Sequence, residues 1–334
     1  MNRRDRTLVS ISHKQPDRTP YTIEFTNEQL ENTVEFYGMS REQFDEYLAN
    51  HCLKVSYNGG HFIEPGVFQD EFGVEWDRTG IDKDIGMIRD LKFSSPRDAT
   101  YSFPEPDLQQ VRDKTTTALE CRGDAVLFGK IGTTYFERAW SLCGLENMLL
   151  YMALEQQFAV DLLGSVLEYN LKIIDTALEY EIDGFYFGDD YGQQTGLLMS
   201  PEMWRKFIKP GLKEMFKRVK KCDKIVALHS CGDISAILPD LIEIGLDIYQ
   251  TVQPEVYNLA RLKNDFGDAL CFWGGISTQR DLPFSSPEEL RETISTTLNI
   301  MSRNGGYIAG PTHRLPTDIP LENVRVLIET LRGE

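Results

Sequence analysis

Short apolar runs alternate with long amphipathic stretches along most of the 334 residues. The runs have the length of buried strands, and the stretches between them repeat apolar residues at helical spacing. This alternation indicates a parallel sheet whose strands are joined by helical crossovers. No Gly-x-Gly-x-x-Gly segment follows the first run, which argues against a dinucleotide-binding sheet. The seven predicted strands span residues 21–25, 125–131, 182–187, 225–229, 247–252, 270–273 and 306–309.

One further strand would close this sheet into a (β/α)8 barrel, the α/β fold called the TIM barrel, for which 334 residues is an ordinary length. We therefore predict a single barrel domain over residues 1–334. Residues 51–120 interrupt the alternation with paired glycines at 59 and 60 and with prolines from 96 to 106. We predict that this stretch is an insertion, a loop and hairpin excursion that decorates the barrel near its N-terminus.

The formal net charge of −17 opposes binding to nucleic acid or to an anionic membrane, because both would repel the chain. The six cysteines are scattered singly and form no disulfide framework. The charged N-terminus leads into no apolar segment of a secretory signal, and no apolar run is long enough to cross a bilayer. We expect a cytoplasmic protein with reduced thiols and no membrane partner.

A metal site is predicted where two strands end. The run at 225–229 ends in His229, and Cys231 follows at the spacing that puts both side chains on one face of a strand. His313 follows the last predicted strand, and the strand ends of a barrel meet at one rim. A His/Cys set with one open position is typical of catalytic zinc, which acts as a Lewis acid. The alternative is that these residues are simply packed or hydrogen-bonded.

Carboxylates also occur at predicted strand ends. Asp189 and Asp190 are consecutive, so one is expected to point into the barrel mouth while the other caps a helix or binds backbone. We predict Asp190 and Glu24 as catalytic groups, for general acid chemistry or as metal anchors. The other predicted contacts, all to substrate, are Asp189, the amides Gln193 and Gln253, and the aromatic rings of Tyr135 and Trp273.

Seven segments, in this order along residues 8–332, carry a family resemblance. They are His-Lys-Gln-Pro-Asp-Arg-Thr-Pro at 13–20, Asp-Glu-Phe-Gly at 70–73, Phe-Glu-Arg-Ala-Trp at 136–140, Gly-Asp-Asp-Tyr-Gly at 188–192, Ser-Pro-Glu at 200–202, His-Ser-Cys-Gly at 229–232 and Gly-Gly-Tyr-Ile at 305–308. With them the chain resembles the uroporphyrinogen decarboxylase superfamily. It looks closer to the cobalamin-dependent methyltransferases of that superfamily, because the Arg-Gln-Ala-Gly-Arg segment of the decarboxylases is absent.

The resemblance implies a zinc ion held by His-x-Cys and a distant cysteine. His229 and Cys231 match the first two ligands, and His313 stands where the third would be cysteine. Fewer thiolates leave zinc more electrophilic, which suits polarising an ether oxygen. We therefore expect an O-demethylase type of enzyme that moves a methyl group from a methoxylated aromatic or a methylamine to the corrinoid (cobalamin) of a partner protein. The methyl group would pass to cobalt(I) by direct displacement.

Two other functions remain open. A decarboxylase of polycarboxylates would need a basic pocket, for which Arg138, Arg280 and Arg314 are the only arginines at the predicted mouth. A non-catalytic subunit that binds a corrinoid or porphyrinoid is the third reading. The sequence specifies neither the methyl donor, nor the direction of transfer, nor whether the chain forms a homodimer.

Overall fold

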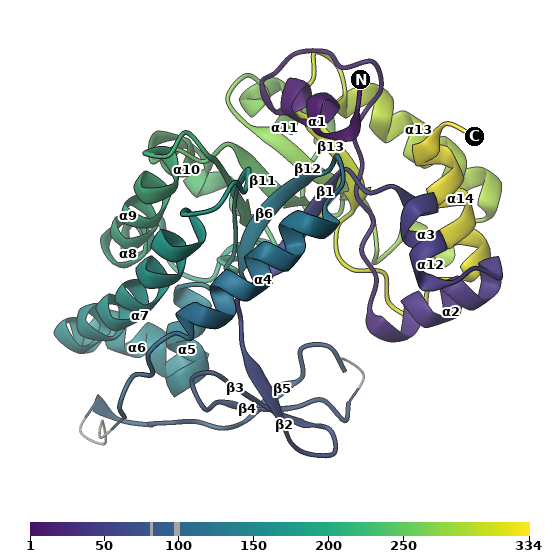
Figure 1. Ribbon diagram of the computed structural model, residues 1–334. Coiled ribbons are helices and arrows are strands. Elements are labelled where there is room, and N and C mark those ends of the chain that lie inside the picture. The colour runs from purple at the N-terminus through teal and green to yellow at the C-terminus, as the bar shows by residue number, and fades with distance from the viewer. Residues whose placement is uncertain (81–82, 97–100) are drawn as a thin grey trace.

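A curled parallel sheet forms the centre of the molecule, and helices surround it (Figure 1). The structure is a computed structural model that describes residues 1–80, 83–96 and 101–334. The order of strands across the sheet follows the order along the chain, as successive right-handed crossovers require. These strands are β1 (Cys52–Ser56), β6 (Val126–Ile131), β7 (Gly184–Gly188), β10 (Ile225–His229), β11 (Ile248–Val252), β12 (Cys271–Ile276) and β13 (Tyr307–Pro311).

The segment from residue 20 to residue 26 joins the two edges of this sheet. On one side Tyr21 and Ala309 form a parallel bridge, and the Thr22 amide donates to the Ala309 carbonyl at 2.9 Å. On the other side the His51 amide, next to β1, donates to the Tyr21 carbonyl at 3.0 Å. This segment therefore occupies the eighth barrel position, and the prediction of a TIM-barrel fold is confirmed.

The strand that the sequence did not reveal is β1, which lies inside the stretch assigned to an insertion. β1 pairs in parallel with β6, and the helix α4 (Leu108–Cys121) contacts both of these strands. Both ends of residues 51–120 are therefore parts of the barrel, and the insertion is shorter than predicted. Between them lies an antiparallel sheet, here called the arm, made of β2 (Gly60–Glu64), β3 (Val67–Asp70), β4 (Glu75–Asp77) and β5 (Met87–Asp90). Of the predicted proline-containing segment, residues 97–100 lie outside the described residues.

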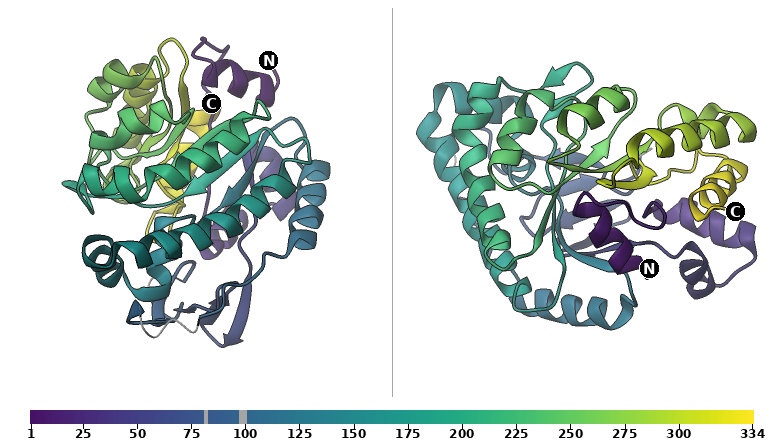
Figure 2. Two further views of the ribbon diagram at one scale, coloured as in Figure 1. Left: turned by 90° about the vertical axis from the view of Figure 1, so that its left-hand side faces the viewer. Right: turned by 90° about the horizontal axis from the view of Figure 1, so that it is seen from above.

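The helices cover the outside of the sheet (Figure 2). Their starts follow local chemistry: the Ser200 hydroxyl accepts from the Met203 amide at 3.2 Å, with Pro201 at the first turn. The two short strands β8 (Gly192–Gln193) and β9 (Gly196–Leu197) form a hairpin beside them. The remaining helices are α1 (Arg3–Ile11), α2 (Asn27–Tyr37), α3 (Arg41–Leu48), α5 (Phe136–Cys143), α6 (Leu145–Leu154), α7 (Gln156–Ala177), α8 (Pro201–Phe207), α9 (Lys209–Lys220), η2 (Ser235–Ile237), α10 (Leu238–Glu243), α11 (Leu259–Phe266), α12 (Asp281–Phe284), α13 (Pro287–Met301) and α14 (Leu321–Arg332). Among the described residues, no helix combines the length and the apolar character that crossing a membrane requires.

The barrel interior has its own small core. Its members come from alternate positions of successive strands: Cys52, Val126, Phe128, Tyr186, Ala227, Ile248, Cys271, Trp273 and Ile308. Because side chains alternate along a strand, the residue two positions further on points into the same interior. Two positions after Cys52, Phe128, Ala227 and Ile248 the chain carries polar side chains: Lys54, Lys130, His229 and Gln250. The barrel interior is therefore polar at the C-terminal ends of its strands.

Candidate metal centre and substrate cavity

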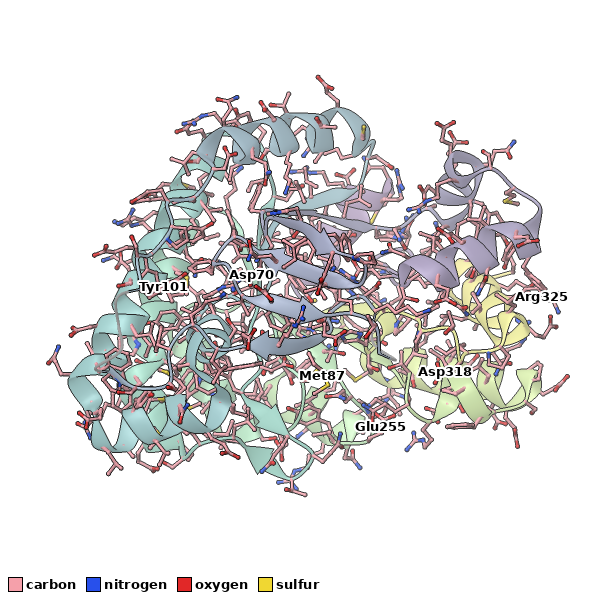
Figure 3. The ribbon with its side chains drawn as sticks, turned by 90° about the horizontal axis from the view of Figure 1, so that it is seen from below. Asp70, Met87, Tyr101, Glu255, Asp318 and Arg325 are labelled. Atoms are coloured by element: carbon pink, nitrogen blue, oxygen red, sulfur yellow. The ribbon has the colours of Figure 1, made fainter. Side chains whose placement is uncertain are left out.

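A cavity of about 1000 Å³ opens at the C-terminal ends of the barrel strands. Strand-end residues such as Lys130 and His229 line one side of it, and the arm contributes Phe68, Trp76 and Arg78. Figure 3 looks onto the arm from below, with Asp70 and Met87 labelled on it. The arm therefore covers part of the barrel mouth, and the enclosed space is large enough for a small organic substrate.

Three potential metal ligands meet in this cavity. The ligand atoms of Asp190, His229 and Cys231 all lie within 4.8 Å of one another, and no metal ion is present. The His229 Nε2 atom is 3.5 Å from the Cys231 Sγ atom and 3.6 Å from an Asp190 carboxylate oxygen. The Cys231 amide also donates to that carboxylate at 2.7 Å, which fixes the loop after β10 against Asp190.

The ring of His229 is held in one tautomer. Its Nδ1 atom is hydrogen-bonded to the side-chain oxygen of Gln250, which also accepts a hydrogen bond of 2.6 Å from the Tyr186 hydroxyl. An amide oxygen only accepts, so Nδ1 carries the proton and the lone pair of Nε2 faces Cys231 and Asp190. Burial lowers the pKa of His229, so the ring is neutral near pH 7. A neutral, oriented imidazole is what a metal ligand requires.

His313, the third metal ligand predicted from the sequence, stays a prediction. It lines the same cavity, but it is exposed, and its ring centre lies 6.0 Å from that of His229. Its ring nitrogens do not belong to the compact group that His229 and Cys231 form with Asp190. The structure places Asp190, which the sequence suggested as an acid or metal anchor, beside His229 and Cys231. Burial raises the pKa of Cys231, so without a metal ion this thiol keeps its proton at neutral pH.

Asp189 points away from the cavity. It is fully buried and accepts hydrogen bonds from the Phe136 amide at 2.9 Å, the Glu137 amide at 2.7 Å and the Tyr191 hydroxyl at 2.6 Å. The carboxylate thereby satisfies the first amides of α5, and Asp189 is not among the residues that line the cavity. Burial raises its pKa to about 7 in spite of these hydrogen bonds.

Glu137 lines the cavity, although the sequence assigned it no role. Burial, with the charges of Asp190 and Asp189, raises its pKa well above the usual range of a carboxyl group. The signal that pointed to it was its place in the Phe-Glu-Arg-Ala-Trp segment that carries the family resemblance.

The other predicted substrate contacts lie outside the cavity lining. Tyr135 is buried against α9, where a Cβ atom at Gly211 would come within 2.3 Å of its ring. The side-chain oxygen of Gln253 accepts from the Gly232 amide at 2.7 Å, next to Cys231. The Gln193 carbonyl accepts from the Asp233 amide at 2.8 Å, while its side chain is exposed. Gln253 and Gln193 therefore hold the loop after β10 in place, and Tyr135 packs in the core.

Trp273 lies deeper in the barrel, with 3% of its surface exposed. Its ring centre is 5.8 Å from that of Tyr186, and the Lys54 ammonium lies 5.1 Å from the ring. Glu24 does line the cavity, where it forms an ion pair of 2.6 Å with Lys54. Burial would raise the pKa of Glu24, but the Lys54 and Lys130 charges outweigh it and lower the pKa to about 2. Glu24 is therefore ionised and is not a proton donor at neutral pH.

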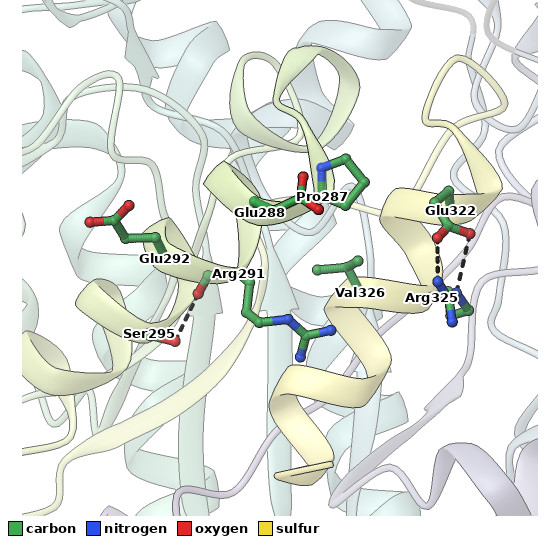
Figure 4. A pocket seen from close by; sticks show the side chains of 8 residues that line it. All are labelled: Pro287, Glu288, Arg291, Glu292, Ser295, Glu322, Arg325 and Val326. Carbon is green, nitrogen blue, oxygen red and sulfur yellow. Dashed lines mark hydrogen bonds and ion pairs between the residues drawn. The ribbon is translucent and has the colours of Figure 1, made fainter.

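A second hollow, of about 490 Å³, lies between α13 and α14 (Figure 4). Charged side chains line it, and several are paired with neighbours, as Arg325 is with Glu322 and Arg291 with Glu329. It holds none of the titratable groups described above. The cavity at the barrel mouth is therefore the candidate functional site.

Comparison with known proteins adds family and fold relationships. The family model described as uroporphyrinogen decarboxylase (URO-D) matches residues 89–333. The methylcobamide:CoM methyltransferase MtaA of Methanosarcina barkeri is 27% identical over 131 residues, which are 39% of this chain and 36% of that protein. A methylated-thiol–coenzyme M methyltransferase of Methanosarcina mazei is 22% identical over 270 residues, covering 78% of this chain and 67% of the relative. The chain thus matches only about a third of the length of the MtaA relative.

The similarity of fold extends over the whole chain. The solved structure of a methyltransferase from Methanosarcina mazei superposes with a TM-score of 0.75, at 16% identity, over 100% of this chain and 99% of that one. At this identity the likeness establishes the shared architecture, in agreement with the barrel described above.

Proposed function

The chain belongs to the uroporphyrinogen decarboxylase family, and from this membership we propose that it is a zinc-dependent methyltransferase that works with a corrinoid protein. Relatives with methyltransferase names support the reaction type. The observation that carries the proposal is the convergence of Asp190, His229 and Cys231 at a cavity that opens at the barrel mouth. There a small methylated substrate and the corrinoid of a partner would meet.

The residues present fit a zinc ion. An imidazole nitrogen, a thiol sulfur and a carboxylate oxygen are all zinc ligands, and three protein ligands leave a position for substrate. His229, Cys231 and Asp190 would hold the ion, with His313 in the same cavity as a further donor. When bound, zinc would supply Lewis acidity toward the heteroatom that carries the methyl group.

The surrounding residues have separate tasks in this proposal. Gln250 orients the His229 ring, and Asp189 fixes the start of α5 and with it the position of Glu137. Glu137, whose pKa is raised by burial, would serve as the proton donor at the cavity wall. The arm limits the access of water to the cavity from one side, which strengthens electrostatic interactions inside it.

We propose that the methyl group moves from a small methylated donor to the corrinoid. A ligand set with a single thiolate leaves zinc electrophilic, which favours an ether oxygen as the departing atom. The second candidate is transfer in the opposite direction, from a methylcobamide to a thiol, and the names of the Methanosarcina relatives favour it. Both candidates use the same site, so one assay run in both directions separates them.

The hypothesis that the chain is a decarboxylase has less support. Each of the three arginines named for it has a carboxylate partner: Arg138 with Asp70 at 2.6 Å, Arg280 with Asp281 at 2.7 Å and Arg314 with Asp84 at 3.4 Å. A substrate with several carboxylates would have to compete with these pairs. The hypothesis of a non-catalytic subunit predicts no turnover in either direction of the assay below.

The test uses zinc-loaded protein, free cobalamin and the visible spectrum of the cobalt. In the first reaction, cob(I)alamin is mixed with 3-methoxybenzoate. In the second reaction, methylcobalamin is mixed with 3-mercaptopropionate. We expect methylcobalamin to form in the first reaction. The Cys231→Ser variant should lower this rate about 100-fold and should also contain less zinc. Cys222→Ser, which changes an exposed thiol, is the matched control. Turnover in the second reaction alone would favour the second candidate, and turnover in neither reaction would refute both.

A further inference from the structure

The Lys130 side chain reaches into the cavity without a partner for its charge. Lys130 lies on β6 and continues the inward positions of Val126 and Phe128. Among the residues that the structure describes, no carboxylate or hydrogen-bond acceptor bonds to its ammonium group, and the Tyr186 ring, 5.9 Å away, is its recorded contact. Burying a charge without a partner is costly, so proteins pair such groups or reserve them for a ligand.

The neighbouring charges do not neutralise Lys130. Lys54, on the adjacent strand β1, is 6% exposed and already forms the ion pair of 2.6 Å with Glu24. Arg314 also lines the cavity and pairs with Asp84 at 3.4 Å. Two lysines thus share one carboxylate at the floor of the cavity. This local excess of positive charge stands in a chain whose net charge is −17.

The lysines lie near the candidate metal centre, and Tyr186 connects the two. The Lys54 ammonium is 4.3 Å from the centre of the Tyr186 ring, and that ring centre is 6.3 Å from the centre of the His229 ring. The Tyr186 hydroxyl shares its acceptor, the Gln250 oxygen, with the His229 ring. A single small molecule can therefore reach both Lys130 and the ligand cluster within the cavity of about 1000 Å³.

We propose that Lys130, supported by Lys54, binds an anionic group, a carboxylate or a sulfonate, of the small substrate. This inference rests on the proposed function for the other end of that substrate, where the methyl-bearing heteroatom meets the ligand cluster. It names a substrate class: an anion binds well, an uncharged analogue binds less tightly, and a cationic methylamine is repelled. Burial, with the Lys54 charge, lowers the pKa of Lys130 to about 7, and a bound anion would stabilise its charged form.

The test compares three ligands that differ only in one end group: 3-methoxybenzoate, 3-methoxybenzenesulfonate and the neutral 3-methoxybenzamide. Their dissociation constants are measured by calorimetry on the full chain, so no turnover is needed. A charge-assisted hydrogen bond predicts that wild type binds at least one anion about 10- to 100-fold more tightly than the amide. The two anions together show whether the site prefers carboxylate or sulfonate.

Variants assign the preference to one side chain. Lys130→Met should bring the anion and amide constants to within about twofold of each other, whereas Lys130→Arg should keep most of the preference. Lys114→Met is the control, because Lys114 is also half-buried near the mouth but donates to the Asn58 carbonyl at 3.2 Å and does not line the cavity. Thermal unfolding of Lys130→Met and of a second neutral variant, Lys130→Gln, verifies that each is folded.

Four results would overturn the inference: no measurable anion binding, equal affinity of wild type for anion and amide, an anion preference that survives in Lys130→Met, or an equal loss in Lys114→Met. Failure of the proposed function looks different. In that case the anion preference depends on Lys130, but no methyl transfer to or from cobalamin is observed.

Discussion

The arm is anchored to the barrel by a buried ion pair, and breaking this pair should have a large cost. Arg138 on α5 and Asp70 at the end of β3 are 2.6 Å apart, with 4% and 5% of their side chains exposed. The Asp70 carboxylate also accepts from the Phe72 and Val74 amides, each at 2.9 Å, and from the Trp76 indole at 3.0 Å. Arg138→Met leaves this carboxylate buried without its counter-charge, which predicts a loss of about 3–5 kcal/mol in the free energy of unfolding.

Urea unfolding, followed by tryptophan fluorescence, measures this loss. The control is Lys83→Met, which removes an exposed ion pair of 2.9 Å with Glu28 and should change the free energy by less than about 0.5 kcal/mol. Adding Asp70→Asn to Arg138→Met should recover part of the loss, because the amide oxygen still accepts from the Phe72 and Val74 amides and the charge of residue 70 is gone. A loss below about 1 kcal/mol in Arg138→Met would refute the reasoning.

Three further predictions concern the cavity. Gln250→Leu removes the group that orients the His229 ring and should weaken zinc affinity about 10- to 100-fold, measured by competition with a chelator; unchanged affinity would contradict the assigned tautomer. Asp190→Ala should lower zinc content more than His313→Ala, by elemental analysis, and the reverse order would restore the ligand set expected from sequence. The pKa of Lys130 is lowered from 10.5 to about 7, so its charge destabilises the fold fully below pH 7 and progressively less as the pH rises toward 10.5. Lys130→Met should therefore raise the urea midpoint more at about pH 6 than at about pH 10, and a uniform change would argue against a buried charge.

The strand ends were accessible from the sequence because they combine two strong signals. An apolar run predicts a buried strand, and the polar residues after it mark the rim, as at His229, Cys231 and Asp190. Alternation also predicted that one of Asp189 and Asp190 would face the mouth while the other would cap a helix. The spacing alone did not show which of the two plays which part, because that depends on where α5 begins in space.

The sequence did not predict that Lys54, Lys130 and Gln250 point into the cavity. Strands that are buried on both faces read as nearly continuous apolar runs, so the sequence does not reveal which alternate set points inward. Lys54 within β1 even obscured that strand, because a lysine between apolar residues resembles an exposed loop. Which alternate residues face the barrel interior becomes clear only from the strand pairing, such as that of Lys54 with Phe128.

Five of the side chains at the mouth come from five different segments of the barrel wall: Glu24, Lys54, Lys130, His229 and Gln250. Replacing any one of these side chains does not remove the backbone hydrogen bonds that hold the barrel strands together. Reactivity and architecture are thereby uncoupled. A substrate preference can be rewritten at a single position, from an anionic donor to a neutral one for example, while the scaffold that presents it stays the same.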